Sequence, residues 1–219
     1  MIDYVRTCKV TLALLTGALM LLQLAPARAE ENSHAAIMLV AKPEVHDPFY
    51  AASVLIVRPL ENGGHAGFVL NKPTKVSLGE AFPDDEPSQK VHQPVFLGGP
   101  VNPDVIFALV KRNDPPVQGE IEFAKDLHLA LTAESVDRVI QQDAGHARFF
   151  AGAVLWRPGE LDEELKRGAW YVMDADTDLA LASKPEELWS TLLKRSEKRA
   201  RTGTAPRIRS EPPAGSVRL

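Results

Sequence analysis

The sequence predicts an α+β fold with a mixed or largely antiparallel sheet. Short apolar runs of strand length follow one another and end abruptly at residues that favour turns. Helix start signals separate some of these runs. Helices and strands do not alternate regularly along the chain, however, as they would in a doubly wound sheet. About 190 residues follow the amino-terminal segment, which is enough chain to bury the core of a single domain.

The amino-terminal segment, residues 1–29, is predicted to be a signal peptide. Arg6 and Lys9 precede an uncharged apolar run over residues 10–25, and an A-x-A pattern ends at Ala29. We therefore expect cleavage after Ala29 and a periplasmic or secreted protein. The alternative is an inner-membrane anchor over residues 10–25, although a spanning helix needs roughly 20 apolar residues.

The only cysteine, Cys8, lies within this predicted signal peptide. A cleaved chain would therefore contain no cysteine. This excludes disulfides, thiolate metal sites and cysteine nucleophiles from the mature protein.

Charge is distributed unevenly over the rest of the chain. Residues 30–193, the predicted domain, carry 14 Lys and Arg against 26 Asp and Glu, whereas residues 194–219 carry 8 against 2. An acidic domain is a poor surface for phosphate backbones, so we expect no nucleic-acid partner. The basic segment is rich in Pro, Gly and Ser and is predicted to be a disordered tail, either solvated or in contact with an anionic surface.

Two strands of the predicted sheet form a hairpin near the start of the domain. Residues 36–41 are a first apolar run, and residues 53–57 are β-branched enough for a central strand. The turn-forming residues 62–64 (Asn-Gly-Gly) then lead into the apolar run 66–70. This order predicts an antiparallel pair, because these turn residues tolerate positive φ.

A short helix and three further strands are predicted in the middle of the chain. Ser77 and Glu80 have capping-box spacing, and Pro83 ends the helix that they begin. The acidic residues 84–89 are expected in an exposed loop. The three apolar runs of strand length are 94–97, 105–110 and 127–131.

The last third of the chain alternates helices and strands. Helices are predicted from Thr132 to Asp143, over residues 160–167, and from a capping box of Ser183 and Glu186 onward. The strands predicted between them cover residues 148–156 and 169–174. The tryptophans at 156, 170 and 189 are interpreted as core residues.

Four blocks of residues give the chain a resemblance to a known family. The blocks are Asp47-Pro48-Phe49-Tyr50 with Ser53-Val54; Gly67-Phe68-Val69-Leu70-Asn71-Lys72-Pro73; Leu97-Gly98-Gly99-Pro100-Val101; and Trp156-Arg157-Pro158-Gly159-Glu160-Leu161 with Gly168-Ala169-Trp170. In order and spacing they resemble the bacterial AlgH/YqgE family. The resemblance covers roughly residues 37–195.

The resemblance implies a compact domain with a branched sheet that forms a small barrel surrounded by helices. It implies no established reaction or cofactor, and the family name derives from a proposed role in regulating alginate production. Family members are generally short, cytosolic and without a leader. The chain is therefore predicted to be a divergent, exported member.

The chain departs from the family pattern at two places. Residues 152–156 read Gly-Ala-Val-Leu-Trp, where members usually have Gly-Tyr-Ala-Gly-Trp, so Leu155 replaces a glycine. Residues 160–162 read Glu-Leu-Asp in place of Gln-Leu-Glu. A side chain at position 155 fills space that a close backbone or a ligand would otherwise use.

Common catalytic and metal-binding motifs are not found in the sequence. It contains no H-E-x-x-H and no G-x-S-x-G, and none of its six histidines forms an i,i+4 pair. Gly98-Gly99-Pro100 lacks the Lys-Ser/Thr of a phosphate loop, so its glycines are expected to permit a tight turn. No metal or cofactor is predicted.

The turn residues and nearby polar side chains suggest one candidate cleft. Its residues are His46, Asp47, Asn71, Lys72, Gly98, Gly99 and Glu160. The first hypothesis is a protein that acts by binding or regulation, with an unknown protein or small molecule as its ligand. The alternative is a small hydrolase-type enzyme that uses His46, Asp47 and Glu160.

Structural interpretations compete with a role in a cleft for several of these residues. Asp47 is suited to start a turn or cap a backbone amide, and Asn71 to bond nearby backbone at the end of a strand. Glu160 and Glu164 lie one helical turn apart and would share a face in a cleft. Their position also suits the amino end of a helix.

Overall fold

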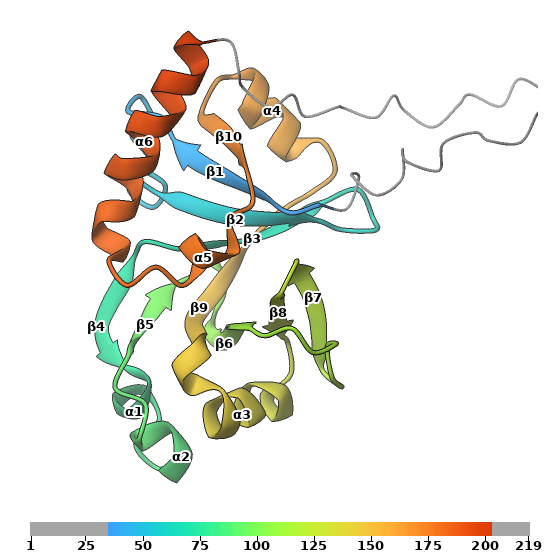
Figure 1. Ribbon diagram of the computed structural model, residues 1–219, viewed down its shortest axis with the longest axis vertical. Helices are drawn as coiled ribbons and strands as arrows, with labels where there is room; N and C mark the ends of the chain where they lie inside the picture. Colours follow the sequence, from blue (N-terminus) through green and yellow to red (C-terminus); the bar gives the residue numbers. More distant parts are fainter. Residues whose placement is uncertain (1–34, 203–219) are drawn as a thin grey trace, which may run out of the picture. The chain divides into compact units, whose positions relative to one another are not determined.

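A single curled sheet organises the part of the chain that the computed structural model describes, residues 35–202 (Figure 1). Its strands are β1 (Ile37–Ala41), β2 (Val54–Pro59), β3 (His65–Val69), β4 (Pro73–Ser77), β5 (Pro94–Leu97), β6 (Val101–Lys111), β7 (Glu120–Ala124), β8 (Leu127–Ala130), β9 (Ala147–Trp156) and β10 (Trp170–Asp174). The helices are α1 (Leu78–Ala81), α2 (Glu86–Gln89), α3 (Ala133–Gln142), α4 (Glu160–Lys166), α5 (Thr177–Ala180) and α6 (Pro185–Arg201), with a 3-10 turn over Ala144–His146.

The sheet is mixed and branched, as predicted. Its main order is β10-β1-β2-β3-β9-β6-β8-β7, and β4 and β5 form a branch that joins it at β9. The long strand β9 pairs antiparallel with β3 and β6 and parallel with β5. Within the described residues the edge strands β10 and β7 are not hydrogen-bonded to each other, so the sheet forms a half-barrel.

The predicted hairpin is confirmed. Strands β2 and β3 pair antiparallel, with Ile56 opposite Phe68, and the Asn62 side chain accepts a hydrogen bond from the Gly64 amide at 2.9 Å. Phe68 is buried against three other phenylalanine rings, of which Phe150 on β9 is 5.1 Å away between centroids. The hairpin therefore supplies the centre of the core.

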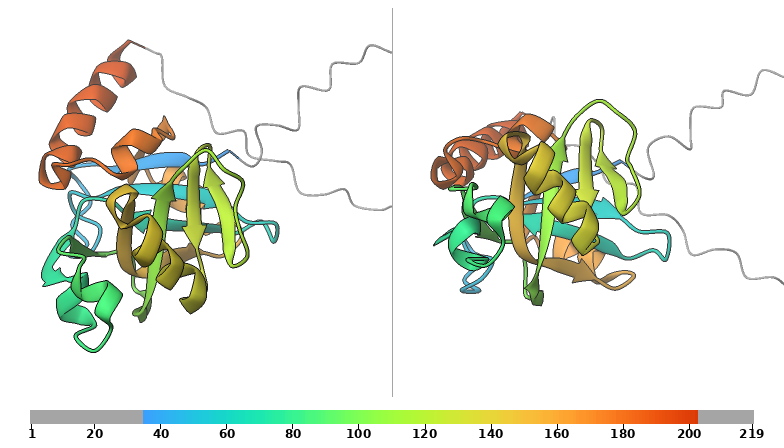
Figure 2. Two further views of the ribbon diagram at one scale, coloured as in Figure 1. Left: turned by 60° about the horizontal axis from the view of Figure 1, so that its bottom comes forward. Right: turned by 90° about the horizontal axis from the view of Figure 1, so that it is seen from below.

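Helices cover the sheet on several sides. On α6, Leu188 and Leu192 pack into the cluster that contains Met38 of β1. Neighbouring residues on a strand point to opposite faces of the sheet, and Leu39, next to Met38 on β1, packs with Leu161 of α4. Helices α4 and α6 therefore cover opposite faces. Figure 2 shows α3 lying against β6 and β8.

A buried arginine ties the carboxyl end of α5 and the segment after it to the sheet. Arg148 of β9 donates hydrogen bonds to the carbonyl oxygens of Ala180 at 2.7 Å and Ala182 at 2.6 Å. Its guanidinium also lies 4.3 Å from the Phe96 ring centroid. Burial lowers the pKa of Arg148 to about 10, and the guanidinium remains charged at neutral pH.

Several short elements differ from the prediction. Residues 84–89 are not simply an exposed loop, because Asp85 accepts from the Ser88 amide at 2.9 Å and begins α2, with Ser88 buried. Strands β4 and β7 and helix α5 were not predicted. They are short, and β4 and β7 each place several side chains in solvent, so they lack an extended apolar run.

The last helix differs from the prediction at both ends. Lys184 occupies the N-cap position without a side-chain cap bond, so the predicted capping box of Ser183 and Glu186 is wrong. The helix continues to Arg201, so the predicted domain boundary at residue 193 is also wrong. Ser196 continues the buried face of the helix, and the basic residues of its last turn suit the carboxyl end of the helix dipole.

The predicted signal peptide, residues 1–29, and the tail beyond Thr202 lie outside the described residues. Among residues 35–202, no helix is long and apolar enough to cross a membrane.

Candidate functional site

The two predicted turn corners lie side by side. The Leu97 amide donates to the Lys72 carbonyl oxygen at 2.9 Å, and the Val69 amide donates to the Gly98 carbonyl oxygen at 2.9 Å. Asn71-Lys72 and Gly98-Gly99 therefore belong to one structural corner, although 27 positions separate Asn71 from Gly98 in the sequence.

Asn71 bonds backbone across this corner. Its side-chain oxygen accepts from the Val54 amide at 2.8 Å, and its side-chain nitrogen donates to the Ala52 carbonyl oxygen at 2.9 Å. Ala52 has a φ of 52°, a conformation that non-glycine residues seldom adopt. The backbone-bonding interpretation of Asn71 is confirmed, and the bonds hold the entry to β2.

Lys72 is directed at the same loop. Its ammonium group donates to the Phe49 carbonyl oxygen and lies 5.4 Å from the Phe49 ring centroid. Burial lowers the pKa of Lys72, and the nearby Asp47 carboxylate opposes that effect.

Asp47 and His46 also bond backbone. One Asp47 carboxylate oxygen accepts from the amides of Phe49 at 2.8 Å and Tyr50 at 2.9 Å, which confirms its role in a turn. The His46 Nδ1 atom lies 2.6 Å from the Glu44 carbonyl oxygen. In the described part of the chain, His46 and Asp47 form no hydrogen bond or ion pair with each other.

The two glycines permit close contact between backbones. A Cβ atom on Gly98 would lie 2.2 Å from the Gly152 carbonyl oxygen, and one on Gly99 would lie 1.9 Å from the Ala153 carbonyl carbon. The chain does bend here between β5 and β6. However, the reason for glycine is the approach of β9, and a positive φ is not required.

Glu160 lies apart from this corner, at the start of α4. Its carboxylate accepts from the Arg157 amide at 2.7 Å and from the Arg157 Nε at 2.6 Å. The backbone bond and then the side-chain bond lower the pKa of Glu160. The interpretation as an acid at the amino end of a helix is confirmed.

The candidate residues thus do not form a hydrolase-like set. His46, Asp47 and Glu160 each bond local groups, and in the described residues none of them bonds another of the three. The hydrolase hypothesis required these three side chains to lie within hydrogen-bond reach of one another, and no such bond is formed among them in the described residues. The corner instead positions a neighbouring side chain, Tyr50.

Tyr50 connects the corner to a pocket beside α4, which we call the α4 pocket. The pocket has a volume of about 310 Å³ and is lined by Tyr50, Val154, Leu155, Trp156, Glu160, Glu163, Glu164 and Arg167. Both Glu160 and Glu164 line it, as their spacing along the helix predicted. The pocket therefore combines aromatic groups with three carboxylates and one guanidinium.

Ring contacts hold Tyr50 in place. Its ring meets Phe49 edge-on at 5.0 Å and Trp170 at 6.0 Å between centroids, and the Trp170 indole donates to Glu164 at 2.8 Å. Burial, followed by the charges of Glu164 and Asp47, raises the pKa of Tyr50 to about 12. The phenol therefore keeps its proton at neutral pH and is available as a donor, because within residues 35–202 its hydroxyl has no hydrogen-bond partner.

Tyr50 is not among the residues predicted from the sequence to form the site. Trp156 and Trp170 were predicted to be core residues, and both are buried. The available signal was that Tyr50, Trp156 and Trp170 all fall within the four family blocks. Within residues 35–202, the α4 pocket included, no group of three or more His, Cys, Asp or Glu side chains is arranged to hold a metal ion.

Comparisons with known proteins agree with this fold. A family model described as AlgH-like matches residues 38–201. A UPF0301 protein of Chlorobaculum tepidum is 30% identical over 156 residues, covering 70% of this chain and 81% of that protein. A second, from Streptomyces coelicolor, is 31% identical over 171 residues, covering 76% and 88%.

The fold also matches a solved structure. The solution structure of the AlgH protein from Pseudomonas aeruginosa superimposes with a TM-score of 0.60 and 26% identity, covering 80% of this chain and 95% of that one. The region that the family model matches spans nearly all of the described residues, including both turn corners and α4. The chain belongs to the AlgH-like family.

Proposed function

We propose that this protein acts after export by binding a partner, without catalysing a reaction, and that the α4 pocket receives a cationic side chain of that partner. The observation that carries the proposal is the meeting of two distant family blocks at this pocket. Of the lining residues, Tyr50 comes from the first block, and Trp156 and Glu160 come from the last; Trp170, also of the last block, packs against the Tyr50 ring.

The chemistry of the lining favours a cationic group. Glu160, Glu163 and Glu164 outnumber Arg167, the one cation of the lining. Arg157, outside the lining, pairs with Glu160, whereas the Glu163 side chain makes no hydrogen bond or ion pair in the described residues. Tyr50 adds a neutral phenol and Trp156 an aromatic surface. Carboxylates beside aromatic groups favour the ammonium or guanidinium of a Lys or Arg side chain.

Leu155 gives the pocket an exposed apolar rim. Its side chain is 49% exposed and stands where family members usually have glycine. An apolar contact beside a cationic one suits a peptide or protein surface, in which Lys or Arg neighbours a Leu. The expected partner is therefore a basic segment of a protein.

A blocked peptide tests the binding step. We expect acetyl-Lys-Leu-Lys-amide to bind the full-length chain saturably by isothermal titration calorimetry, with a Kd on the order of 1 mM or lower. Glu163→Gln is expected to weaken binding about two- to fivefold, because an exposed ion pair contributes up to roughly 1 kcal/mol.

The matched controls are a neutral peptide and a distant carboxylate. Acetyl-Gln-Leu-Gln-amide is expected not to bind, and Glu197→Gln on α6, outside the pocket, is expected to leave the affinity unchanged. Equal binding of the two peptides, or equal loss in Glu163→Gln and Glu197→Gln, would show that the pocket is not the site.

Export is tested separately. The predicted cleavage site after Ala29 leads us to expect a protein of residues 30–219 in the periplasmic fraction, identified by mass spectrometry. Recovery only of a chain that still begins at Met1, or only from the cytoplasm, would contradict export while leaving the binding proposal intact.

A further inference from the structure

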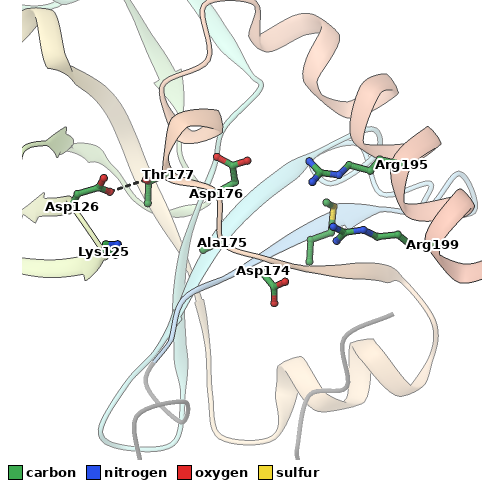
Figure 3. Close-up of a pocket in the computed structure, with 9 residues that line it drawn as sticks. Lys125, Asp126, Asp174, Ala175, Asp176, Thr177, Arg195 and Arg199 are labelled. Carbon is green, nitrogen blue, oxygen red and sulfur yellow. Dashed lines mark hydrogen bonds between the residues drawn. The ribbon is translucent and has the colours of Figure 1, made fainter. Parts of the chain in front are cut away.

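A second pocket opens between the edges of the half-barrel, and we call it the edge pocket (Figure 3). It has a volume of about 390 Å³. Its lining residues come from the β7–β8 turn (Lys125, Asp126), from β10 and the segment after it (Met173, Asp174, Ala175, Asp176), from α5 (Thr177) and from α6 (Arg195, Arg199). None of these residues lines the α4 pocket.

Opposite charges stand on opposite walls of the edge pocket. Arg195 and Arg199 extend from successive turns of α6 toward the segment that carries Asp174 and Asp176 (Figure 3). Across the described part of the chain, none of these four side chains makes a hydrogen bond or an ion pair. Two arginines and two aspartates therefore border the same cavity without neutralising one another, and Lys125 of the β7–β8 turn adds a further cation to the lining.

Contacts at the border of the cavity fix the positions of its walls. On one side, the Trp189 indole donates to the Ala41 carbonyl oxygen at 2.8 Å, and the Ser196 hydroxyl lies 3.3 Å from the Met173 sulfur, which fixes α6 against the sheet. On the other side, the Thr177 hydroxyl donates to Asp126 at 2.7 Å. This bond joins the β7–β8 turn to α5 across the gap between the edge strands.

Asp126 is already occupied and is not counted among the free carboxylates. It accepts from Thr177 and also lies 3.7 Å from the Lys111 ammonium group. Its backbone has a φ of 56°, which places this residue in a tight turn. Asp126 therefore builds the pocket. Asp174 and Asp176 make no hydrogen bond or ion pair within residues 35–202, although the charge of Asp176 is one of those that raise the pKa of Lys111.

We propose that the edge pocket binds a small zwitterion, with its carboxylate held by Arg195 and Arg199 and its ammonium group by Asp176, while Asp174 adds negative charge on the other side of the same segment (Figure 3). A multiply charged anion would be repelled by the two aspartates, and a polycation by the two arginines. A ligand that carries one charge of each sign satisfies both walls. Met173 and Ala175 offer an apolar surface to the carbon chain between the charges.

The size of the cavity limits the ligand to a free amino acid or a very short peptide. Its volume lies near the lower end of the range for small-molecule sites, roughly 300–1,000 Å³. Arginine pairs on a helix bind a carboxylate through several directed N–H donors, which favours Arg195 and Arg199 as the carboxylate wall.

A series of zwitterions with increasing charge separation tests this proposal. Glycine, β-alanine, γ-aminobutyrate and glycylglycine are each titrated into the full-length chain and followed by NMR. At least one is expected to bind saturably, with a Kd below about 10 mM. Its N-acetylated form and its amide, which each lack one charge, are expected to bind about tenfold more weakly or not at all.

Two variants and one control assign the walls. Arg199→Gln and Asp176→Asn are each expected to weaken the bound zwitterion about tenfold, the first acting on its carboxylate and the second on its ammonium group. Lys198→Gln, on the same helix but outside the lining, is expected to change nothing. Circular dichroism checks that all three variants remain folded.

Three results would overturn the proposal: no saturable binding by any member of the series, equal binding of a zwitterion and its N-acetylated form, or binding that survives both Arg199→Gln and Asp176→Asn. The second result would indicate a simple anion site. The lysine peptide and the zwitterions address different residues, so failure of one proposal is distinguishable from failure of the other.

Discussion

At the residue scale, the polar side chains of the turn corners hold backbone groups that lie far away in sequence. Asp47 caps its own turn, whereas Asn71 and Lys72 reach the loop before β2. Each bond satisfies a backbone group that no strand partner occupies. The residue types that first suggest a cleft therefore build the frame beside which Tyr50 is held.

Asn71→Ala tests this role. The change leaves the Val54 amide and the Ala52 carbonyl oxygen without their partner, so we expect it to lower the free energy of unfolding by about 1–3 kcal/mol. Urea denaturation measures the effect. The control is Asn113→Ala, at an exposed position without such bonds in the described residues, for which a loss of the same size would refute the assignment.

Gly99→Ala tests the close contact of β9. The added methyl group would lie 1.9 Å from the Ala153 carbonyl carbon, so we expect the free energy of unfolding to fall by about 3 kcal/mol. Gly145→Ala adds the same group where no atom lies within 4 Å. Similar melting temperatures for the two variants would contradict this packing.

The local roles of Asp47 and Glu160 could be predicted from the sequence because each bonds residues within three positions of itself. Tyr50 could not be predicted as a site residue. Its neighbours Trp170 and Glu164 are more than 100 positions away, and no local pattern encodes that contact.

At the scale of elements, carboxylates at helix starts stabilise several of the helices. Ser77 donates to Glu80 from its amide at 2.8 Å and from its hydroxyl at 2.9 Å, and these bonds lower the pKa of Glu80 below its ordinary value of 4.5. Glu160 is held in the same way by Arg157. These helix starts were recognisable from their spacing in the sequence.

The lowered pKa of Glu80 predicts loss of stability in acid. The unfolded chain binds this proton more readily than the folded chain does. The contribution of the Glu80 carboxylate to stability is therefore fully present above pH 4.5 and is lost as the pH falls through the lower pKa of the folded state. Glu80→Gln removes this contribution, so its unfolding free energy is expected to fall less steeply than that of the parent below pH 4.5. Thermal melts across this range provide the measurement, and Glu61→Gln, an exposed residue outside any helix, is expected to match the parent.

The length of α6 gives a prediction of its own. A chain that ends after Thr202 is expected to melt like the full chain. One that ends after Leu193 loses the buried Ser196 and the last turns of the helix, and is expected to be less stable by about 2 kcal/mol. Equal stability of the two truncated chains would show that the folded domain needs no residue beyond Leu193.

Helices and strands were predicted correctly where the sequence contains an apolar run of strand length or a clear helix start signal. Strands β4 and β7 and helix α5 were missed, since tertiary contacts stabilise these elements more than local pattern does. Glu120 on β7, for example, is buried and pairs with Arg112, the residue that follows β6. The extension of α6 was missed because its charged sequence resembles a solvated tail.

At the scale of the whole domain, the sequence indicated an α+β class, but the details of the topology came from long-range pairing. The parallel pair β5–β9 and the branching of the sheet at β9 depend on contacts between segments more than 50 positions apart. The branched sheet was expected only because of the resemblance to a known family. The two open edges of the half-barrel, and therefore the edge pocket, were not foreseen.

The proposed function depends on the family blocks meeting to form a binding pocket for a cationic partner. NMR shift mapping during titration with acetyl-Lys-Leu-Lys-amide tests it most directly. We expect saturable shifts at Tyr50, Trp156 and Glu163, with Trp189 on the opposite face unaffected. Shifts that leave Tyr50 and Glu163 unchanged, or no shifts at all at saturating peptide, would contradict it.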